Sequence, residues 1–396
     1  MVSFDNTEIA FGSKSDYELQ KAWWLFKLIG NNSLVKLSKP LASVAVKVGF
    51  PFKYLIKETI YEHFCGGESI TECENTIVKL GKYHVYTILD YSVEGKESED
   101  DFEFTTREIM ATQERASKDQ LVPFNVFKLT GLARFALLEK ISAGKELNAE
   151  EKKEFERVKE RVDRLCHKAA EIDKCLMMDA EETWIQPVMD ELMLEMMRKY
   201  NRNKALIFNT FQMYRHDRLQ VLKELTIRAK EENFFVGVKL VRGAYMEKER
   251  ARAREMGYPS PIQPDKQSCD RDYDLALSHI LLNIDRISLV AGTHNEASSV
   301  YLTKLMKEQR LEPGDKRIYF SQLLGMSDHI SFNLAYSGYN VVKYVPFGPV
   351  KDVLPYLIRR AEENTSVAGQ TSRELKLLSG ERARRKASGR SYKKSK

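Results

Sequence analysis

Eight short apolar runs alternate with segments of helical length along most of this 396-residue chain, and this alternation limits the possible folds more than any other feature. The runs are rich in β-branched and aromatic residues. Their apolar character is nearly continuous, which is typical of strands buried on both faces. We predict strands at 84–91, 124–129, 175–179, 205–212, 234–241, 287–293, 318–323 and 341–344.

The helix-length segments between these runs are what βαβ units require. Eight βα units in roughly 290 residues predict an α/β protein with a closed (β/α)8 barrel. An open doubly wound sheet is the competing architecture. The sequence GxGxxG, which would support the open sheet, does not follow the first strand. The pattern favours the barrel and leaves both architectures open.

Residues 1–80 lack the alternation and predict a helical N-terminal extension. Its first helix begins around Trp23 and Trp24, and amphipathic stretches follow at 41–61 and 70–80. The barrel domain is then expected at 81–370. Within it, residues 145–174 are highly charged, with Glu–Lys and Glu–Arg pairs at helical spacing, and predict an exposed helical insertion.

The last segment, 371–396, is basic and lacks apolar periodicity, so we predict a disordered tail. Because this tail holds much of the net charge of +6, the rest of the chain is close to neutral. The charge therefore predicts no nucleic-acid face across the fold. The tail itself is either an ordinary solvated terminus or a contact for anionic lipid or nucleic acid.

Cysteine spacing and hydropathy limit the other classes of protein to which the chain could belong. No two of the five cysteines form a CxxC pair, so no structural metal is expected, and their odd number suits a reducing compartment. The first residues contain no apolar core of a signal peptide, and no run approaches 18 apolar residues.

If the barrel forms, its active site lies at the carboxyl ends of the strands. A polar strand end is commonly just solvated. Here, however, seven of the eight ends carry polar or aromatic groups. Bringing several charged side chains together at one end of the barrel costs desolvation free energy, which favours a functional site there. The residues at these ends include Lys128, Asp179, Gln212, Lys239, Arg242, Thr293, His294, Asn295 and Tyr344.

The segment after the eighth strand carries Tyr356, Arg359, Arg360 and Glu363, which share one helix face at i, i+3, i+4 and i+7. One interpretation is an exposed Arg–Glu helix, in which each pair contributes about 0.3–0.5 kcal/mol. The other is a clamp for an anion, in which guanidinium groups hold a carboxylate by bidentate hydrogen bonds.

Six motifs, in order along the chain, resemble those of the proline dehydrogenase family. They are FKLTGL at 127–132, MMDAEE at 177–182, KLVRGAY at 239–245, GTHN at 292–295, QLLGM at 322–326 and YLIRRAEEN at 356–364. The resemblance implies a distorted (β/α)8 TIM barrel with noncovalent FAD. It also implies oxidation of L-proline to pyrroline-5-carboxylate, with electrons passed to a membrane quinone (ubiquinone or menaquinone).

The resemblance further implies residue roles. Arg359 and Arg360 would bind the proline carboxylate, Lys128 would assist them, and Glu363 would orient the pair. Asp179 would pair with an arginine or with Lys128. The residues that would wall the pyrrolidine ring are Tyr245, Leu323, Tyr344 and Tyr356. The residues that would contact FAD are Gln212, Lys239, Arg242, Gly243, Ala244, Thr293, His294 and Asn295.

Two positions depart from the family pattern. Some members carry Arg then Lys where this chain has Lys239 then Arg242, and a lysine cannot make a bidentate contact. His216 stands where many relatives place a basic residue, and it stays outside the predicted site.

Three alternative functions are open. Hydroxyproline dehydrogenase shares the fold, but in that branch the position that corresponds to Tyr344 resembles a serine. A non-enzymatic binding module would use the basic tail. A flavin-free barrel acting on a phosphorylated substrate would need a glycine-rich cradle that the last strands lack. The implied location is a bacterial cytoplasm, peripheral at the inner membrane, or a mitochondrion if a leader has been removed.

Overall fold

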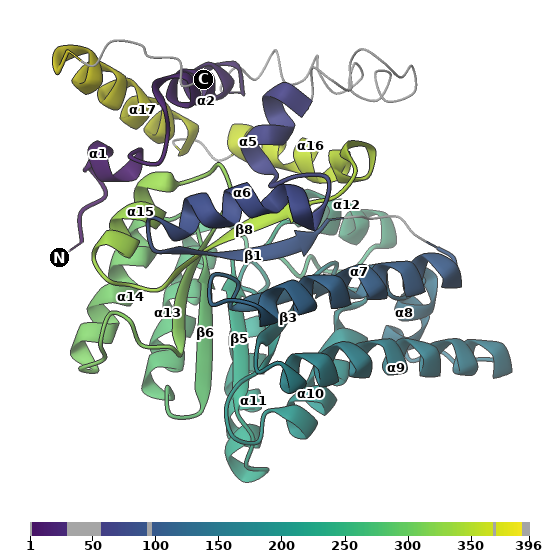
Figure 1. Ribbon diagram of the computed structural model, residues 1–396. Coiled ribbons are helices and arrows are strands. Elements are labelled where there is room, and N and C mark those ends of the chain that lie inside the picture. The colour runs from purple at the N-terminus through teal and green to yellow at the C-terminus, as the bar shows by residue number, and fades with distance from the viewer. Residues whose placement is uncertain (1, 30–56, 93–96, 367–369, 390–396) are drawn as a thin grey trace. The chain divides into compact units, whose positions relative to one another are not determined.

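The structure is a computed structural model and describes residues 2–29, 57–92, 97–366 and 370–389 (Figure 1). Eight strands follow chain order around a closed barrel. Neighbouring strands from β1 to β7 pair in parallel. The strands are β1 Val85–Tyr91, β2 Phe124–Lys128, β3 Cys175–Asp179, β4 Ile207–Gln212, β5 Val236–Val241, β6 Ile287–Gly292, β7 Ile318–Leu323 and β8 Val341–Phe347. The predicted barrel is confirmed, and the open sheet is wrong.

Helices separate the strands as βαβ units require. They are α7 Glu99–Ser117, α8 Phe135–Ser142, α9 Ala149–Glu171, α10 Gln186–Tyr200, α11 Arg218–Glu231, α12 Met246–Met256, α13 Lys266–Leu282, α14 Glu296–Glu308, α15 Asp328–Tyr336 and α16 Val350–Ser366. Side-chain caps define several starts, because an oxygen accepts a hydrogen bond from a backbone amide of the first turn, at about 1 kcal/mol each. These caps are Ser98, Asn148, Asp265 and Asn295.

Contacts divide the chain into two compact units. The first contains residues 88–91 and 95–321, and therefore β2 to β6 with their helices. Aromatic rings fill its interior: the Phe124 ring meets those of Phe208 and Tyr319 edge-on, with centroids 5.6 Å and 4.8 Å apart. Such T-shaped pairs add about 0.5–1.5 kcal/mol beyond the area that they bury.

The second unit contains residues 2–87, 92–94 and 322–396. Its outer helices are α1 Thr7–Ala10, α2 Asp16–Ile29, the π-helical turn Lys57–Tyr61, α5 Glu62–Phe64, α6 Ile70–Gly81 and α17 Gln370–Ala387. The predicted helix at 70–80 is confirmed, and the helix that contains Trp23 is present but begins earlier than predicted, at Asp16. Most of the predicted stretch 41–61 lies outside the described residues. No helix in the described part of the chain is both long and apolar enough to cross a bilayer.

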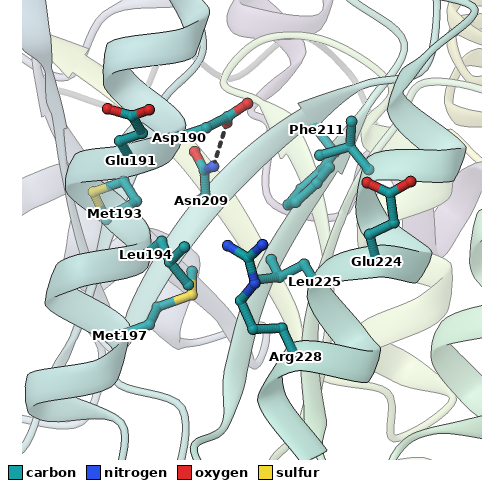
Figure 2. Close-up of a pocket in the computed structure, with 11 residues that line it drawn as sticks. Asp190, Glu191, Met193, Leu194, Met197, Asn209, Phe211, Glu224, Leu225 and Arg228 are labelled. Atoms are coloured by element: carbon teal, nitrogen blue, oxygen red, sulfur yellow. Dashed lines mark hydrogen bonds between the residues drawn. The ribbon is translucent and has the colours of Figure 1, made fainter. Parts of the chain in front are cut away.

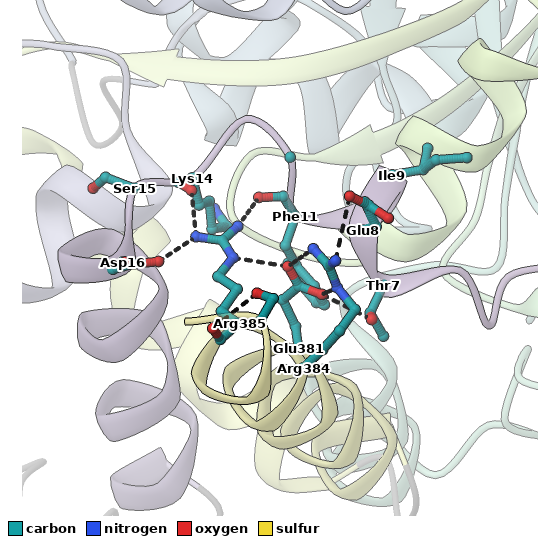
Figure 3. Close-up of polar contacts among 12 residues, drawn as sticks. Thr7, Glu8, Ile9, Phe11, Lys14, Ser15, Asp16, Glu381, Arg384 and Arg385 are labelled. Carbon is teal, nitrogen blue, oxygen red and sulfur yellow. Dashed lines mark hydrogen bonds and ion pairs between the residues drawn. The ribbon is translucent and has the colours of Figure 1, made fainter. Parts of the chain in front are cut away.

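The expectation of a disordered tail is wrong for residues 371–387, which form α17. Leu377 and Leu378 pack with α2 in a buried cluster. Arg385 donates to Glu381 at 2.7 Å, to Asp16 at 2.8 Å and to two backbone carbonyls (Figure 3). The acids Glu381 and Asp16 therefore balance part of the basic charge of α17. Residues 390–396 lie outside the described part.

The charged stretch 145–174 is helical as predicted, but it is not solvated on all sides. α9 begins with a capping box of Asn148 and Glu151 and buries an apolar face. Arg161 is 1% exposed and donates to Glu103 at 2.9 Å and to the Leu132 carbonyl at 2.9 Å. The charge of Arg161 is paired with an acid on α7. The expectation of an exposed helix is therefore wrong for the face of α9 that carries Arg161.

Candidate active site

Two lysines and two acids form a paired cluster at the carboxyl ends of β1, β2, β3 and β5. Lys239 Nζ lies 2.5 Å from Asp179 Oδ1. Lys128 Nζ lies 3.7 Å from Asp179 Oδ2 and 3.4 Å from both Asp90 oxygens. Exposed fractions of these side chains are between 4% and 14%. Buried charges are tolerated only when they are paired, and each ammonium of this cluster lies beside a carboxylate.

Strand register explains why these groups meet. Lys128 lies directly opposite Asp179 in the β2–β3 pair, and both end their strands. Three predicted residues, Lys128, Asp179 and Lys239, are therefore brought together. Asp90 was missed, although it stands next to the last residue of the first apolar run. Lys128 also lies one position before the end of its predicted run, so the same signal was present for Asp90.

A second group joins the loops after β2, β3 and β4. Gln212 Nε2 donates to the Glu181 carbonyl at 2.8 Å. The Thr130 amide donates to Glu181 Oε1 at 3.1 Å, and the Thr130 hydroxyl donates to the other carboxyl oxygen. Burial raises the pKa of Glu181 to about 7, against these hydrogen bonds, which lower it. Glu181 was also missed, although the MMDAEE motif contains it.

Arg242 and Thr293 meet beside β5 and β6. Arg242 donates from Nε to Asp270 at 2.6 Å, from Nη1 to the Thr293 hydroxyl at 2.7 Å and from Nη2 to the Ser298 hydroxyl at 2.9 Å. Its guanidinium lies 4.4 Å from the Tyr273 ring centroid. The side chain is thus held in one orientation before any ligand binds.

The residues that flank this pair have local roles. Asn295 caps α14 by accepting from the Ser298 amide at 3.1 Å, and the half-buried His294 precedes it. Gly243 has φ +131°, and a Cβ there would lie 2.5 Å from the Tyr214 ring. Only glycine fits that position. Ala244 is exposed, and the half-buried Tyr245 precedes α12.

These side chains fit an anionic cofactor such as a flavin dinucleotide. An amide, an ammonium, a guanidinium and a hydroxyl lie at neighbouring strand ends, and such donors bind phosphate and carbonyl oxygens. Gly243 adds an exposed backbone that a ligand can approach closely. Among the residues that the structure describes, no cluster of His, Cys, Asp or Glu is arranged to hold a metal ion.

In the second unit, α16 presents the predicted Tyr–Arg face. Tyr356 is 6% exposed and packs in a cluster that includes Val353, with Leu323 against it. Arg360 is 7% exposed, and its guanidinium lies 5.0 Å from the Tyr356 ring centroid. Arg359 is half-buried. An exposed Arg–Glu helix is therefore the wrong interpretation for Arg360. The Glu363 side chain lies outside the described residues.

Tyr344 lies on β8 and is 5% exposed. Its carbonyl accepts a hydrogen bond from the Leu324 amide at 2.8 Å, which joins the QLLGM segment to β8. Leu323 ends β7 as predicted, whereas Tyr344 lies within β8, three residues before its end.

A crevice of about 170 Å³ lies elsewhere in the first unit, between α10, α11 and β4 (Figure 2). Met193, Leu194 and Phe211 line it with other side chains, and none of the predicted site residues does. Asp190 at its edge accepts from Asn209 at 2.8 Å and from both Nη groups of Arg218. The crevice is thus a gap between barrel helices, away from the charged strand ends.

The fold and these groups define a (β/α)8-barrel protein with paired charges at the carboxyl ends of its strands. A family model described as "Proline dehydrogenase" matches residues 73–373. The chain therefore belongs to the proline dehydrogenase family, a family of flavoprotein oxidoreductases.

Two relatives illustrate the range of similarity. The chain is 44% identical over 243 residues to proline dehydrogenase 1, mitochondrial, of Homo sapiens, with 61% of this chain and 40% of that protein covered. It is 30% identical over 412 residues to hydroxyproline dehydrogenase of Xenopus laevis, with 95% and 88% covered. The chain thus spans about two fifths of the human relative and most of the frog one.

Among solved structures, the chain is similar to proline utilization A from Bdellovibrio bacteriovorus inactivated by N-propargylglycine. The TM-score is 0.69 at 21% identity, with 91% of this chain and 38% of that chain covered. At this identity the likeness supports the fold alone, and it agrees with the barrel.

Proposed function

We propose that this chain oxidises L-proline to pyrroline-5-carboxylate with noncovalent FAD and passes the electrons to a membrane quinone. The observation that carries the proposal is the buried Arg360 beside Tyr356, within the family motif at 356–364. A guanidinium held beside an aromatic ring suits bidentate binding of a carboxylate, and the family acts on a substrate that carries one.

For substrate binding, we assign the carboxylate to Arg359 and Arg360. The fork of a guanidinium matches two carboxylate oxygens, which fixes both the position and the orientation of the substrate. Lys128 adds positive charge, and Glu363 orients the arginine pair. Tyr245, Leu323, Tyr344 and Tyr356 supply the apolar walls for the pyrrolidine ring.

For the cofactor, the donors at the ends of β4, β5 and β6 hold FAD. These are Gln212, Lys239, Arg242, Gly243, Ala244, Thr293, His294 and Asn295. The chemistry that FAD would supply there is acceptance of a hydride from the ring carbon next to nitrogen. The protein contributes orientation and charge: Asp179 fixes the ammonium of Lys239, and Thr293 and Asp270 fix the guanidinium of Arg242.

Hydroxyproline dehydrogenase is the second candidate, because a frog relative with that name covers 95% of this chain. Tyr344 is the observation against it. The Tyr344 ring is buried at this position. In the hydroxyproline branch the corresponding position resembles a serine, whose smaller side chain would leave room for the 4-hydroxyl group of the substrate. We therefore assign proline as the preferred substrate.

The quinone acceptor implies contact with a membrane surface. The human relative is named a mitochondrial protein, which supports the mitochondrial location over the bacterial one. In either location the acceptor is dissolved in lipid, so the protein must approach the bilayer to be reoxidised.

The test uses the full chain, reconstituted with FAD, with L-proline and a soluble quinone analogue. Pyrroline-5-carboxylate is trapped with o-aminobenzaldehyde. The Arg360→Lys variant loses a bidentate contact and should raise KM for proline by about 10- to 100-fold, with a smaller change in kcat. The exposed Arg228 on α11 provides the matched control, since Arg228→Lys should change neither constant. No trapped product from flavin-loaded parent protein would refute the proposal.

A further inference from the structure

Helix α2 is apolar on two sides, and only one of them is buried. Leu19, Ala22 and Phe26 belong to the cluster with α17. Tyr17, Trp24 and Leu28 instead face solvent, with exposed fractions of 62%, 49% and 53%. Their spacing of seven and four residues puts them in one line along the helix.

Lysines flank this line on both sides. At 100° per residue, Lys27 lies on one edge of the Tyr17–Trp24–Leu28 line and Lys21 on the other. Lys27 Nζ is 4.7 Å from the Trp23 ring centroid and 5.1 Å from that of Trp24. Lys21 pairs with Glu62 at 2.6 Å. The chain has no acidic residue between Glu18 and Glu58, so α2 beyond its first turn carries positive charge only.

α17 extends the positive surface. The Arg382 guanidinium lies 4.4 Å from the Trp23 ring centroid, and Trp23 Nε1 donates to the Ser379 hydroxyl at 2.9 Å. Lys376 and Lys386 are exposed on the same helix. In Figure 1, α2 and α17 lie side by side, as their shared cluster requires.

Single exposed apolar residues are ordinary and need no function. A line of Trp, Tyr and Leu between lysines is different, because it is the composition of helices that lie in the plane of a membrane interface. Tyrosine and tryptophan suit the headgroup level, and lysines extend their charged ends to the phosphates. Two copies of such a surface would repel each other by their like charges, which disfavours a second copy of this chain as the occupant.

We infer that the Tyr17–Trp24–Leu28 face of α2 is the surface by which this protein lies on a membrane that contains anionic phospholipid. This inference rests on the proposed function for its purpose, since a lipid-dissolved quinone has to be reached from the membrane surface. The contact is peripheral: the apolar side chains enter the interface, and Lys27 and Arg382 meet the phosphate groups.

The test is cosedimentation of the full chain with vesicles of phosphatidylcholine, with and without phosphatidylglycerol. The parent should bind the anionic vesicles and bind them less at high salt. Trp24→Ser with Leu28→Ser should weaken this binding by about tenfold or more. Lys27→Gln should weaken it about fivefold, the value expected for one basic residue near an anionic surface.

The control variant removes equally exposed apolar side chains from other helices. Leu282 on α13 and Ile227 on α11 are 71% and 57% exposed, and replacing both with serine should leave vesicle binding unchanged. Proline oxidation with a soluble acceptor should be the same in all variants. Oxidation with a quinone dissolved in the vesicles should fall for the α2 variants only.

Three results would overturn the inference. They are equal binding to neutral and anionic vesicles, no difference between the α2 and control variants, or self-association of the parent that the Trp24 and Leu28 changes abolish. Vesicle binding needs no turnover, so it is measured independently of the catalytic proposal. A protein that binds vesicles through α2 but never oxidises proline would refute the proposed function and leave this surface in place.

Discussion

Removal of the Asp179 carboxylate tests whether the charges at the strand ends are held as one paired cluster. Asp179→Asn leaves the Lys239 ammonium beside a neutral amide, in a site where the two side chains are 9% and 14% exposed. At 2.5 Å and an effective dielectric of about 20, the attraction that is lost is about 6–7 kcal/mol before desolvation. Breaking a buried pair from one side costs about 3–5 kcal/mol in measured cases. Because asparagine keeps one acceptor oxygen, we expect a loss of about 3 kcal/mol in the free energy of unfolding.

The assay is urea unfolding of the parent, Asp179→Asn, Lys239→Met and the double variant. If the cost comes from the lost attraction between Asp179 and Lys239, the double variant should recover much of it, with a coupling energy of about 2 kcal/mol. Asp163 is the matched control, since it pairs with Lys199 at 2.7 Å with side chains 37% and 54% exposed. Asp163→Asn should cost less than about 1 kcal/mol. Equal losses at Asp179 and Asp163, or strictly additive single losses, would refute the reasoning.

Three further variants test other parts of the molecule. Because burial raises the pKa of Glu181 to about 7, the folded state binds a proton that the unfolded state releases near pH 4.3. The parent should therefore lose about 3 kcal/mol of stability relative to Glu181→Gln as pH rises from about 4.3 to 7; a pH-independent difference in urea unfolding would contradict this. Arg385→Ala leaves the fully buried Glu381 with one fewer cation, so amide hydrogen exchange in α17 should accelerate by about 100-fold. Unchanged exchange would show that this contact does not stabilise the helix. Tyr344→Ser should weaken proline use and improve tolerance of 4-hydroxyproline, and equal steady-state selectivity in variant and parent would count against the assignment.

The barrel could be predicted from the sequence because its strands are buried on both faces. Continuous apolar runs then locate the strands directly, and β3 and β7 have the predicted bounds. The eighth strand was predicted three residues too short, because Pro346, Gly348 and Pro349 indicated a turn directly after Tyr344. In the structure the Pro346 carbonyl accepts from the Gly66 amide at 2.9 Å, so β8 continues to Phe347.

The partners of the site residues were harder to predict than the residues themselves. Asp179 was expected to meet an arginine or Lys128, and it lies 3.7 Å from Lys128; its 2.5 Å contact with Lys239 was not predicted. Which strand ends face each other depends on barrel register, which the composition of a single run does not contain. α17 was missed for a similar reason. A basic segment without apolar periodicity predicts disorder, whereas contacts that stabilise α17 come from Asp16 and Phe11, far away in the sequence.

The most direct test of the account is the absorption spectrum of the purified full chain under anaerobic conditions. We predict flavin bands, either as purified or after incubation with FAD, that bleach when L-proline is added. Colourless protein that cannot be reconstituted with FAD, or flavin bands that L-proline leaves unchanged, would contradict it.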